Sequence, residues 1–285
     1  MKPVCLVAAV TGVLAAAGAA SAADVKIEHA VARVVVIPEA RSDVGVEIVR
    51  GTAELPALQV RRRGDRVEID GGLRRRIGAC SGDASGASQP GEGARVRVRG
   101  IGEVEVSQAP LIVLRTPMDV DVEANGAVYG AVGRDATSVE LGNGGCGSWT
   151  VGNTAGRLDL SVAGSGDVRA GTSGDLDVSV AGSGDVVAGA TRSFEAAVAG
   201  SGNVVVARVD GNADISIAGS GDVTVRAGRA PSLDVAIAGS GDVHFGGEVG
   251  NVDASLIGSG DVHIASVTGS IDRSVIGSGQ VIVGR

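Results

Sequence analysis

A short motif, written SVAGSGDV at residues 161–168, returns in near-identical form at regular spacing through the second half of the sequence. Its copies lie 18 to 20 residues apart when they are aligned on the first glycine of the motif. A fixed period of this length is typical of a solenoid, in which each repeat buries its apolar face only by stacking on its neighbours. The seven first glycines are Gly164, Gly182, Gly200, Gly219, Gly239, Gly258 and Gly277.

Apolar residues stand two, four and six positions before the first glycines, as Val162, Leu160 and Leu158 do before Gly164, except that Arg273 stands four positions before Gly277. A period of two is typical of a β-strand with one buried face. Valine recurs four positions after each first glycine, so each repeat predicts two short strands around a Gly-Ser-Gly bend. We therefore expect an all-β fold: a single-stranded parallel β-helix with ~19 residues per coil and seven clear coils within residues 121–285.

The bend is expected to repeat because its glycines supply a positive φ or a close backbone approach that a Cβ would obstruct. Serine follows the first glycine, and Asp, Asn or Gln stands three positions after it. The candidate structural repeat residues are Gly164, Ser165, Asp167, Gly182, Asp185, Gly200, Gly219, Asp222, Gly239, Asp242, Gly258, Asp261 and Gly277.

Acidic residues form two columns, one five positions before the first glycine and one three positions after it. Stacked strands lie about 4.8 Å apart, where two like charges repel by nearly 1 kcal/mol even in water. One explanation is that the second column caps the bend by accepting hydrogen bonds from turn N–H groups. The alternative is that stacked carboxylates bind calcium. Capping is favoured because calcium-binding repeats of this kind use a nine-residue spacing.

The sequence assigns no catalytic, cofactor-binding or metal residues, since GxSxG, HExxH and phosphate-binding loops are not found in it. His244 and His263 are weak metal candidates because both stand five positions after a first glycine and should stack on adjacent coils. An enzyme of the polysaccharide-lyase or hydrolase type remains an alternative, with its site in the loops of residues 80–120. The acidic net charge of −8 and the shortage of aromatic residues argue against a nucleic-acid partner.

The first 120 residues divide into two further parts. Residues 1–22 have the layout of a cleaved signal peptide, and no later segment predicts a transmembrane helix. Residues 23–120 predict a β-rich N-terminal cap that covers the edge of the β-helix. Two degenerate coils are expected after it, VEANGAV at 122–128 and ELGNGGCG at 140–147, the latter with Gly142 level with the first glycines.

Two of the three cysteines, Cys80 and Cys146, follow the predicted signal peptide. In an oxidising compartment a single disulfide between them is the default expectation. No CxxC motif or cluster of histidines accompanies either residue, which argues against a redox or metal role.

Repeated AGSGDV after an exported leader and a β-rich N-terminal part resembles the head GIN domain family, whose members are described as auto-transporter adhesins of bacterial envelopes. The resemblance covers essentially all of the chain after the leader, and it implies no catalytic residues. Together these features predict a non-enzymatic protein of the periplasm or cell surface with an adhesion-like or scaffold binding surface. Its partner would be an envelope or extracellular glycan or protein, and the chain would be a monomer or an end-to-end dimer.

Overall fold

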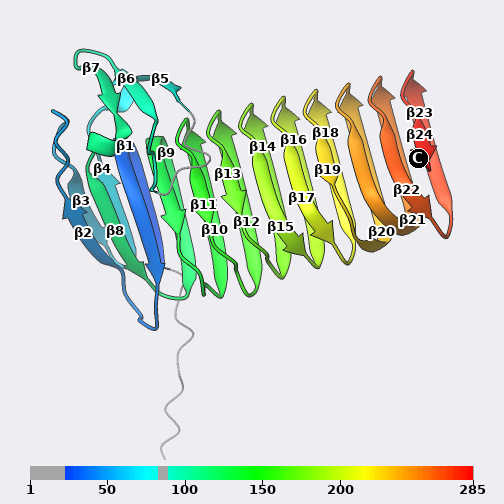
Figure 1. Ribbon diagram of the computed structural model, residues 1–285, viewed down its shortest axis with the longest axis horizontal. Helices are drawn as coiled ribbons and strands as arrows, with labels where there is room; N and C mark the ends of the chain where they lie inside the picture. The colour runs from blue at the N-terminus through cyan, green and yellow to red at the C-terminus, as the bar shows by residue number, and fades with distance from the viewer. Residues whose placement is uncertain (1–22, 83–88, 285) are drawn as a thin grey trace, which may run out of the picture.

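The computed structural model describes residues 23–82 and 89–284, so the predicted signal peptide lies outside the described residues. Strands stack in a row along the long axis of the molecule (Figure 1). Among the described residues the helical elements are two single turns of 3-10 helix, η1 (Arg74–Arg76) and η2 (Val106–Gln108). The predicted all-β parallel β-helix is confirmed. None of the described helices is long and apolar enough to cross a membrane.

Each coil of the repeat has one strand that ends at the first glycine and a second strand that begins four residues later. The first strands are β12 (Arg157–Gly164), β14 (Asp175–Gly182), β16 (Ser193–Gly200), β18 (Ala213–Gly219), β20 (Arg229–Gly239) and β23 (Ile271–Gly277). The second strands are β13 (Val168–Ala170), β15 (Val186–Thr191), β17 (Val204–Val209), β19 (Val223–Val225), β22 (Val262–Val267) and β24 (Val281–Val283). β21 (Val243–Gly258) runs from the second strand of one coil into the first strand of the next.

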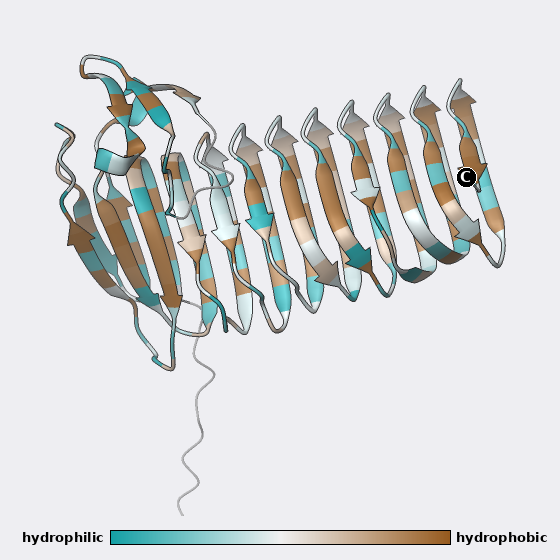
Figure 2. Cartoon of the chain, in the orientation of Figure 1, coloured by the Kyte–Doolittle hydropathy of each residue, from teal (hydrophilic) through white to brown (hydrophobic). Residues whose placement is uncertain are grey.

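Residues at equal positions in the repeat pair with one another on neighbouring parallel strands, which we call rungs. Gly164 pairs with Gly182 and Gly182 with Gly200, and the same register continues to Gly277. Aliphatic side chains at alternate positions are buried inside the coils. Figure 2 shows apolar residues recurring at the same level of successive rungs, as the period of two predicts.

Two further coils precede the clean repeats and contain β9 (Asp119–Val132), β10 (Ser138–Gly145) and β11 (Trp149–Val151). The predicted register of the coil at residues 140–147 is wrong by three residues. Gly142 pairs with Ser161, and the residues level with Gly164 are Gly145 and Gly126. The buried strand positions set this register, because Leu141 lies over Leu160 inside the coil.

The N-terminal strand β1 (Ala23–Pro38) is itself a rung, parallel to β9. Its other edge pairs in parallel with β4 (Arg66–Asp70) and β8 (Leu111–Thr116). The outer strands β2 (Gly45–Val49) and β3 (Gln59–Arg63) then run antiparallel to β8 and β4. Antiparallel strands thus cover the N-terminal end of the β-helix. The rung β1 belongs to the segment that the sequence assigns to the cap.

A small antiparallel sheet, which we call the flap, projects over the first rungs (Figure 1). It consists of β5 (Ile77–Ser81), β6 (Arg95–Val98) and β7 (Gly102–Glu105). Its buried valines form a second apolar cluster with Val31, Ala127 and Tyr129 of the solenoid. A disulfide between Cys80 and Cys146 ties it to a coil corner, with 6.0 Å between the two Cα atoms.

Among the described residues, β23 and β24 pair with a neighbouring rung on one side. Val275 and Val283 lie at positions that are buried in earlier coils, and here they are 38% and 44% exposed. Arg273 stands in another inward column, where it pairs with the buried Ala254, and it is exposed. In the last coil a charged residue thus takes an inward position that apolar residues occupy in the earlier repeats.

Candidate binding surface along the solenoid

The corner of every coil is built on the first glycine of the motif. Gly182 has a φ of 140°, and a Cβ placed on it would lie 2.3 Å from the carbonyl oxygen of Gly164 on the preceding rung. The same carbonyl accepts hydrogen bonds from the N–H groups of Ser183 and Gly184, at 2.9 and 3.1 Å. The close stacking of corners thus requires glycine for both its conformation and its lack of a side chain.

The acidic column after the bend hydrogen-bonds one coil to the next. Oδ1 of each residue accepts the backbone N–H of the residue at the same position one rung later, for example Asp242 N–H to Asp222 Oδ1 at 2.8 Å. Asn203 takes the same place between Asp185 and Asp222, at 2.8 and 3.1 Å. The other links are Asp167 to Asp185, Asp242 to Asp261 and Asp261 to Gln280. One carboxylate oxygen of each of these aspartates therefore accepts a backbone N–H hydrogen bond, as the capping explanation requires.

The acidic column before the bend is longer in the structure than in the sequence analysis. Among the described residues ten carboxylates stand in register on ten successive rungs, and we call this set the acidic ladder. Its members are Asp24, Asp121, Glu140, Asp159, Asp177, Glu195, Asp214, Asp234, Asp253 and Asp272. The seven first glycines place the start of this column at Asp159. Glu140 was not predicted because the coil at residues 140–147 was misaligned, and Asp24 was not predicted because β1 lies in the segment assigned to the cap.

Charge is only partly compensated along the acidic ladder. Arg66 bonds Asp24 at 2.6 Å, and Arg157 bonds Asp177 at 2.9 Å. Burial, followed by the charges of Glu140 and Asp24, raises the pKa of Asp121 to about 6. Burial and the charge of Asp159 likewise raise the pKa of Asp177. At these two positions burial and a neighbouring carboxylate both oppose ionisation.

Small side chains lie beside the acidic ladder and make one flat face. We define the ladder face as the acidic ladder together with the outward residues three and one positions before each first glycine. The first of these columns is Ser161, Ser179, Ala197, Ser216, Ala236, Ser255 and Ser274, and the second is Ala163, Ala181, Ala199, Ala218, Ala238, Ile257 and Ile276; all of them are exposed. Two shallow grooves of about 370 and 350 Å³ follow the acidic ladder on this face.

His244 and His263 pair on adjacent rungs, and their ring centroids are 6.3 Å apart. In residues 23–82 and 89–284 no three His, Cys, Asp or Glu side chains converge so that they could hold a metal ion. The two histidines thus stack on adjacent rungs without a third ligand in that part of the chain.

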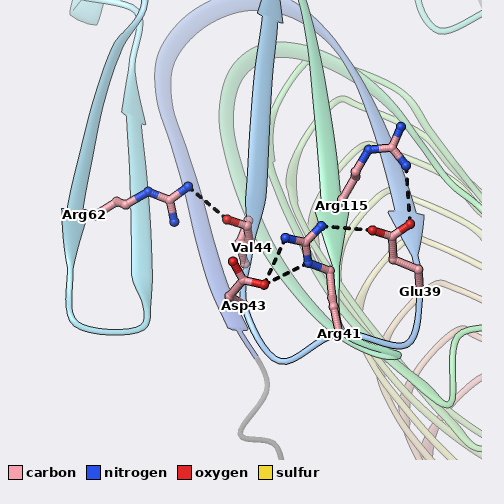
Figure 3. Close-up of polar contacts among 6 residues, drawn as sticks. All are labelled: Glu39, Arg41, Asp43, Val44, Arg62 and Arg115. Carbon is pink, nitrogen blue, oxygen red and sulfur yellow. Dashed lines mark hydrogen bonds and ion pairs between the residues drawn. The ribbon is translucent and has the colours of Figure 1, made fainter.

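Polar contacts also bind the loops of the N-terminal cap. Arg41 bonds both Glu39 and Asp43, and Arg115 reaches the same Glu39 (Figure 3). Arg62 donates to the carbonyl oxygen of Val44 at 2.9 Å. These arginines hold the loop before β2 against β8 and β3.

The loops of residues 80–120, which the sequence offers as the alternative enzymatic site, form part of the flap, η2 and β8; residues 83–88 lie outside the described residues. On the flap, Arg95 lies 3.7 and 3.6 Å from Glu103 and Glu105, so these carboxylates pair with an arginine. Arg76 donates from Nε to the carbonyl oxygen of Arg99. The contacts described for these polar side chains thus tie the strands of the flap together.

Comparison with solved structures found a crystal structure described as a putative lipid binding protein from Parabacteroides distasonis. It is 15% identical, covers 93% of both chains and has a TM-score of 0.47. A second, described as a putative cell adhesion protein from Clostridium sporogenes, is 9% identical over 93% of this chain and 94% of that chain, with a TM-score of 0.18. No curated protein matches. The family model described as "putative auto-transporter adhesin, head GIN domain" matches residues 24–208 and 207–284, and the chain therefore belongs to the head GIN domain family.

Proposed function

We propose that this protein is a non-enzymatic, exported binding protein that contacts an envelope or extracellular glycan or protein through its ladder face. The adhesin description of its family favours a binding role. The observation that carries the proposal is the repetition of one outward pattern, Asp, Ser or Ala, and Ala, on successive rungs. An extended partner would meet equivalent groups about every 4.8 Å along the stack.

Repetition also argues for binding rather than catalysis. A catalytic site requires one tuned pair of groups, whereas the ladder face offers near-equivalent carboxylates on every rung. Small side chains leave the backbone accessible, so a flat partner can approach closely. The disulfide between Cys80 and Cys146 fits an oxidising compartment and supports export.

The binding proposal is tested with the mature protein on a glycan array and on immobilised envelope fractions, together with a reducing-sugar assay. We expect saturable binding without release of sugar products. The double variant Ala199→Arg/Ala218→Arg places two long cations on paired rungs of the ladder face, and it should weaken binding at least tenfold.

The matched control adds the same two charges elsewhere. Ala207→Arg/Thr224→Arg alters outward positions of the second strands β17 and β19 and should leave binding within about twofold. Equal loss in both double variants would contradict a contact through the ladder face. Release of reducing sugars would instead support the polysaccharide-degrading alternative.

A further inference from the structure

A groove of about 330 Å³ lies where the flap meets the first coil corners. It is lined by β5 residues including Ile77, by the corner residues Gly126 and Cys146, and by His29 and Arg74. Cys146 belongs to the disulfide that fixes the flap, so a covalent bond holds two walls of this groove together. Its size lies at the lower end of the range for small-molecule sites.

The lining of the flap groove differs from the acidic composition of the solenoid. Residues 121–285 contain nineteen acidic residues and nine arginines, a net charge of −10. The grooves on the ladder face are each lined by several carboxylates. In the described part of the chain no aspartate or glutamate lines the flap groove, whereas Arg74 and His29 do.

Arg74 is available for a ligand. It is exposed, and within residues 23–82 and 89–284 its side chain has neither a hydrogen bond nor an ion pair. Three other arginines of the cap, Arg41, Arg62 and Arg115, are by contrast held by carboxylates or a carbonyl oxygen (Figure 3). His29, by contrast, is positioned by Asp70, whose Oδ1 lies 3.3 Å from Nδ1.

Backbone strain is concentrated at the same groove. Three described residues other than glycine have positive φ, and two of them are His29 at 55° and Arg74 at 46°. Such residues persist where the surrounding structure fixes them, and they cluster at active sites and ligand-binding sites. Here the strained positions are those that bring an imidazole and a guanidinium to the walls of one apolar groove.

We propose that the flap groove binds a small organic anion that has an apolar body. The guanidinium of Arg74 would pair with the anionic group, His29 would line the rim, and the apolar body would lie against Ile77 and the glycine backbone of the corners. The flap groove shares no residue with the ladder face, so this proposal does not depend on the proposed adhesion-like role.

Two fluorescent probes that differ by one charged group test the proposal on the oxidised mature protein. 8-Anilinonaphthalene-1-sulfonate carries a sulfonate, and N-phenyl-1-naphthylamine has the same body without it. We expect the sulfonate probe to bind more tightly than the neutral probe. Arg74→Gln should weaken the sulfonate probe about tenfold and leave the neutral probe within twofold.

The matched control is Arg50→Gln, because Arg50 is an exposed arginine that lines a different, aliphatic groove beside Leu55 and Leu58. It should change neither dissociation constant by more than about twofold. If Arg74→Gln leaves binding of the sulfonate probe unchanged, or if Arg50→Gln weakens it equally, the proposal is wrong. Equal affinity of the protein for inorganic sulfate and for the sulfonate probe would also overturn it, since the apolar body would then contribute nothing. Circular dichroism of both variants checks that they remain folded.

Discussion

At the scale of single residues, the molecule depends on glycines that no other residue can replace. Gly219 has a φ of 143°, and a Cβ on it would lie 2.2 Å from the carbonyl oxygen of Gly200. Both the conformation and the contact involve backbone atoms, so a rotamer change cannot relieve them. A methyl group at a corner must therefore separate two rungs.

We predict that Gly219→Ala lowers the free energy of unfolding by about 3 kcal/mol, the sum of strain and lost contacts between rungs. For a chain of this size this is a fall in Tm of roughly 6–12 °C, measured by circular dichroism. Ala218→Ser changes the exposed neighbour and serves as the control, with a shift of about 1 °C or less. A Gly219→Ala melt that matches the control would contradict the proposed requirement for glycine.

A second prediction at this scale concerns Asp121, whose pKa is about 6 in the folded state against an ordinary value of 3.8. Between these two values the folded protein holds a proton that the unfolded chain has lost, so stability falls as pH rises through this window. Asp121→Asn removes the ionised carboxylate and should therefore stabilise the protein above pH 6. Because the side chain is partly exposed to solvent, we expect a gain of about 1 kcal/mol.

Urea unfolding of wild type and Asp121→Asn at several pH values tests this sign. The difference in stability should be near zero at pH 3.8, grow between pH 4 and 6, and stay constant above. A variant that is less stable than wild type at pH 7.5 would show that Asp121 is held by attraction rather than opposed by its neighbours.

At the scale of the structural element, the unit of stability is the corner rather than the strand alone. Each corner repeats two contacts, the carbonyl of the first glycine to the next bend and the aspartate to the next backbone N–H. An aspartate thus joins two elements that are 18 to 20 residues apart in the sequence. The energy of one such contact is small, but the corner column repeats it on successive rungs.

We predict that Asp222→Ala costs about 1–2 kcal/mol, because the N–H of Asp242 loses its acceptor at 2.8 Å. Asp222→Asn should recover most of that loss, since Asn203 already accepts the N–H of Asp222 in this column. Chemical denaturation of the two variants measures the difference. If asparagine is as destabilising as alanine, the negative charge rather than the acceptor oxygen is what matters at the corner.

At the scale of the whole molecule, the repeat predicts the solenoid because strand period, corner glycine and spacing all agree. They disagree in the degenerate coils, where glycines at 142, 144, 145 and 147 offer several alignments. There the inward position two before the corner holds Asn143, which is buried and donates to the carbonyl oxygen of Gly147 at 2.7 Å. A polar residue inside the coil removes the apolar signal that would have fixed the register.

The flap and its groove could not be predicted in the same way. Their strands have no repeat, and their partners are distant segments brought together by Cys80 and Cys146. The sequence does not predict the positive φ values of His29 and Arg74. His29 lies inside a run that reads as one strand, and Arg74 begins a run of three arginines. The contacts between these non-repeating segments could therefore be identified only from the structure.

The charge of the solenoid leads to a prediction for the molecule as a whole. Ladder carboxylates on adjacent rungs repel, and added salt screens this repulsion because the Debye length falls from about 30 Å at 0.01 M to below 8 Å above 0.15 M. Raising NaCl from 10 to 300 mM should therefore raise Tm by several degrees. At equal ionic strength, CaCl₂ and MgCl₂ should agree within about 2 °C, because aspartate oxygens at the corners already accept backbone N–H groups. A larger rise specific to calcium, reversed by chelator, would establish the calcium-stabilised alternative, since ligand binding to the folded state alone raises Tm in this way.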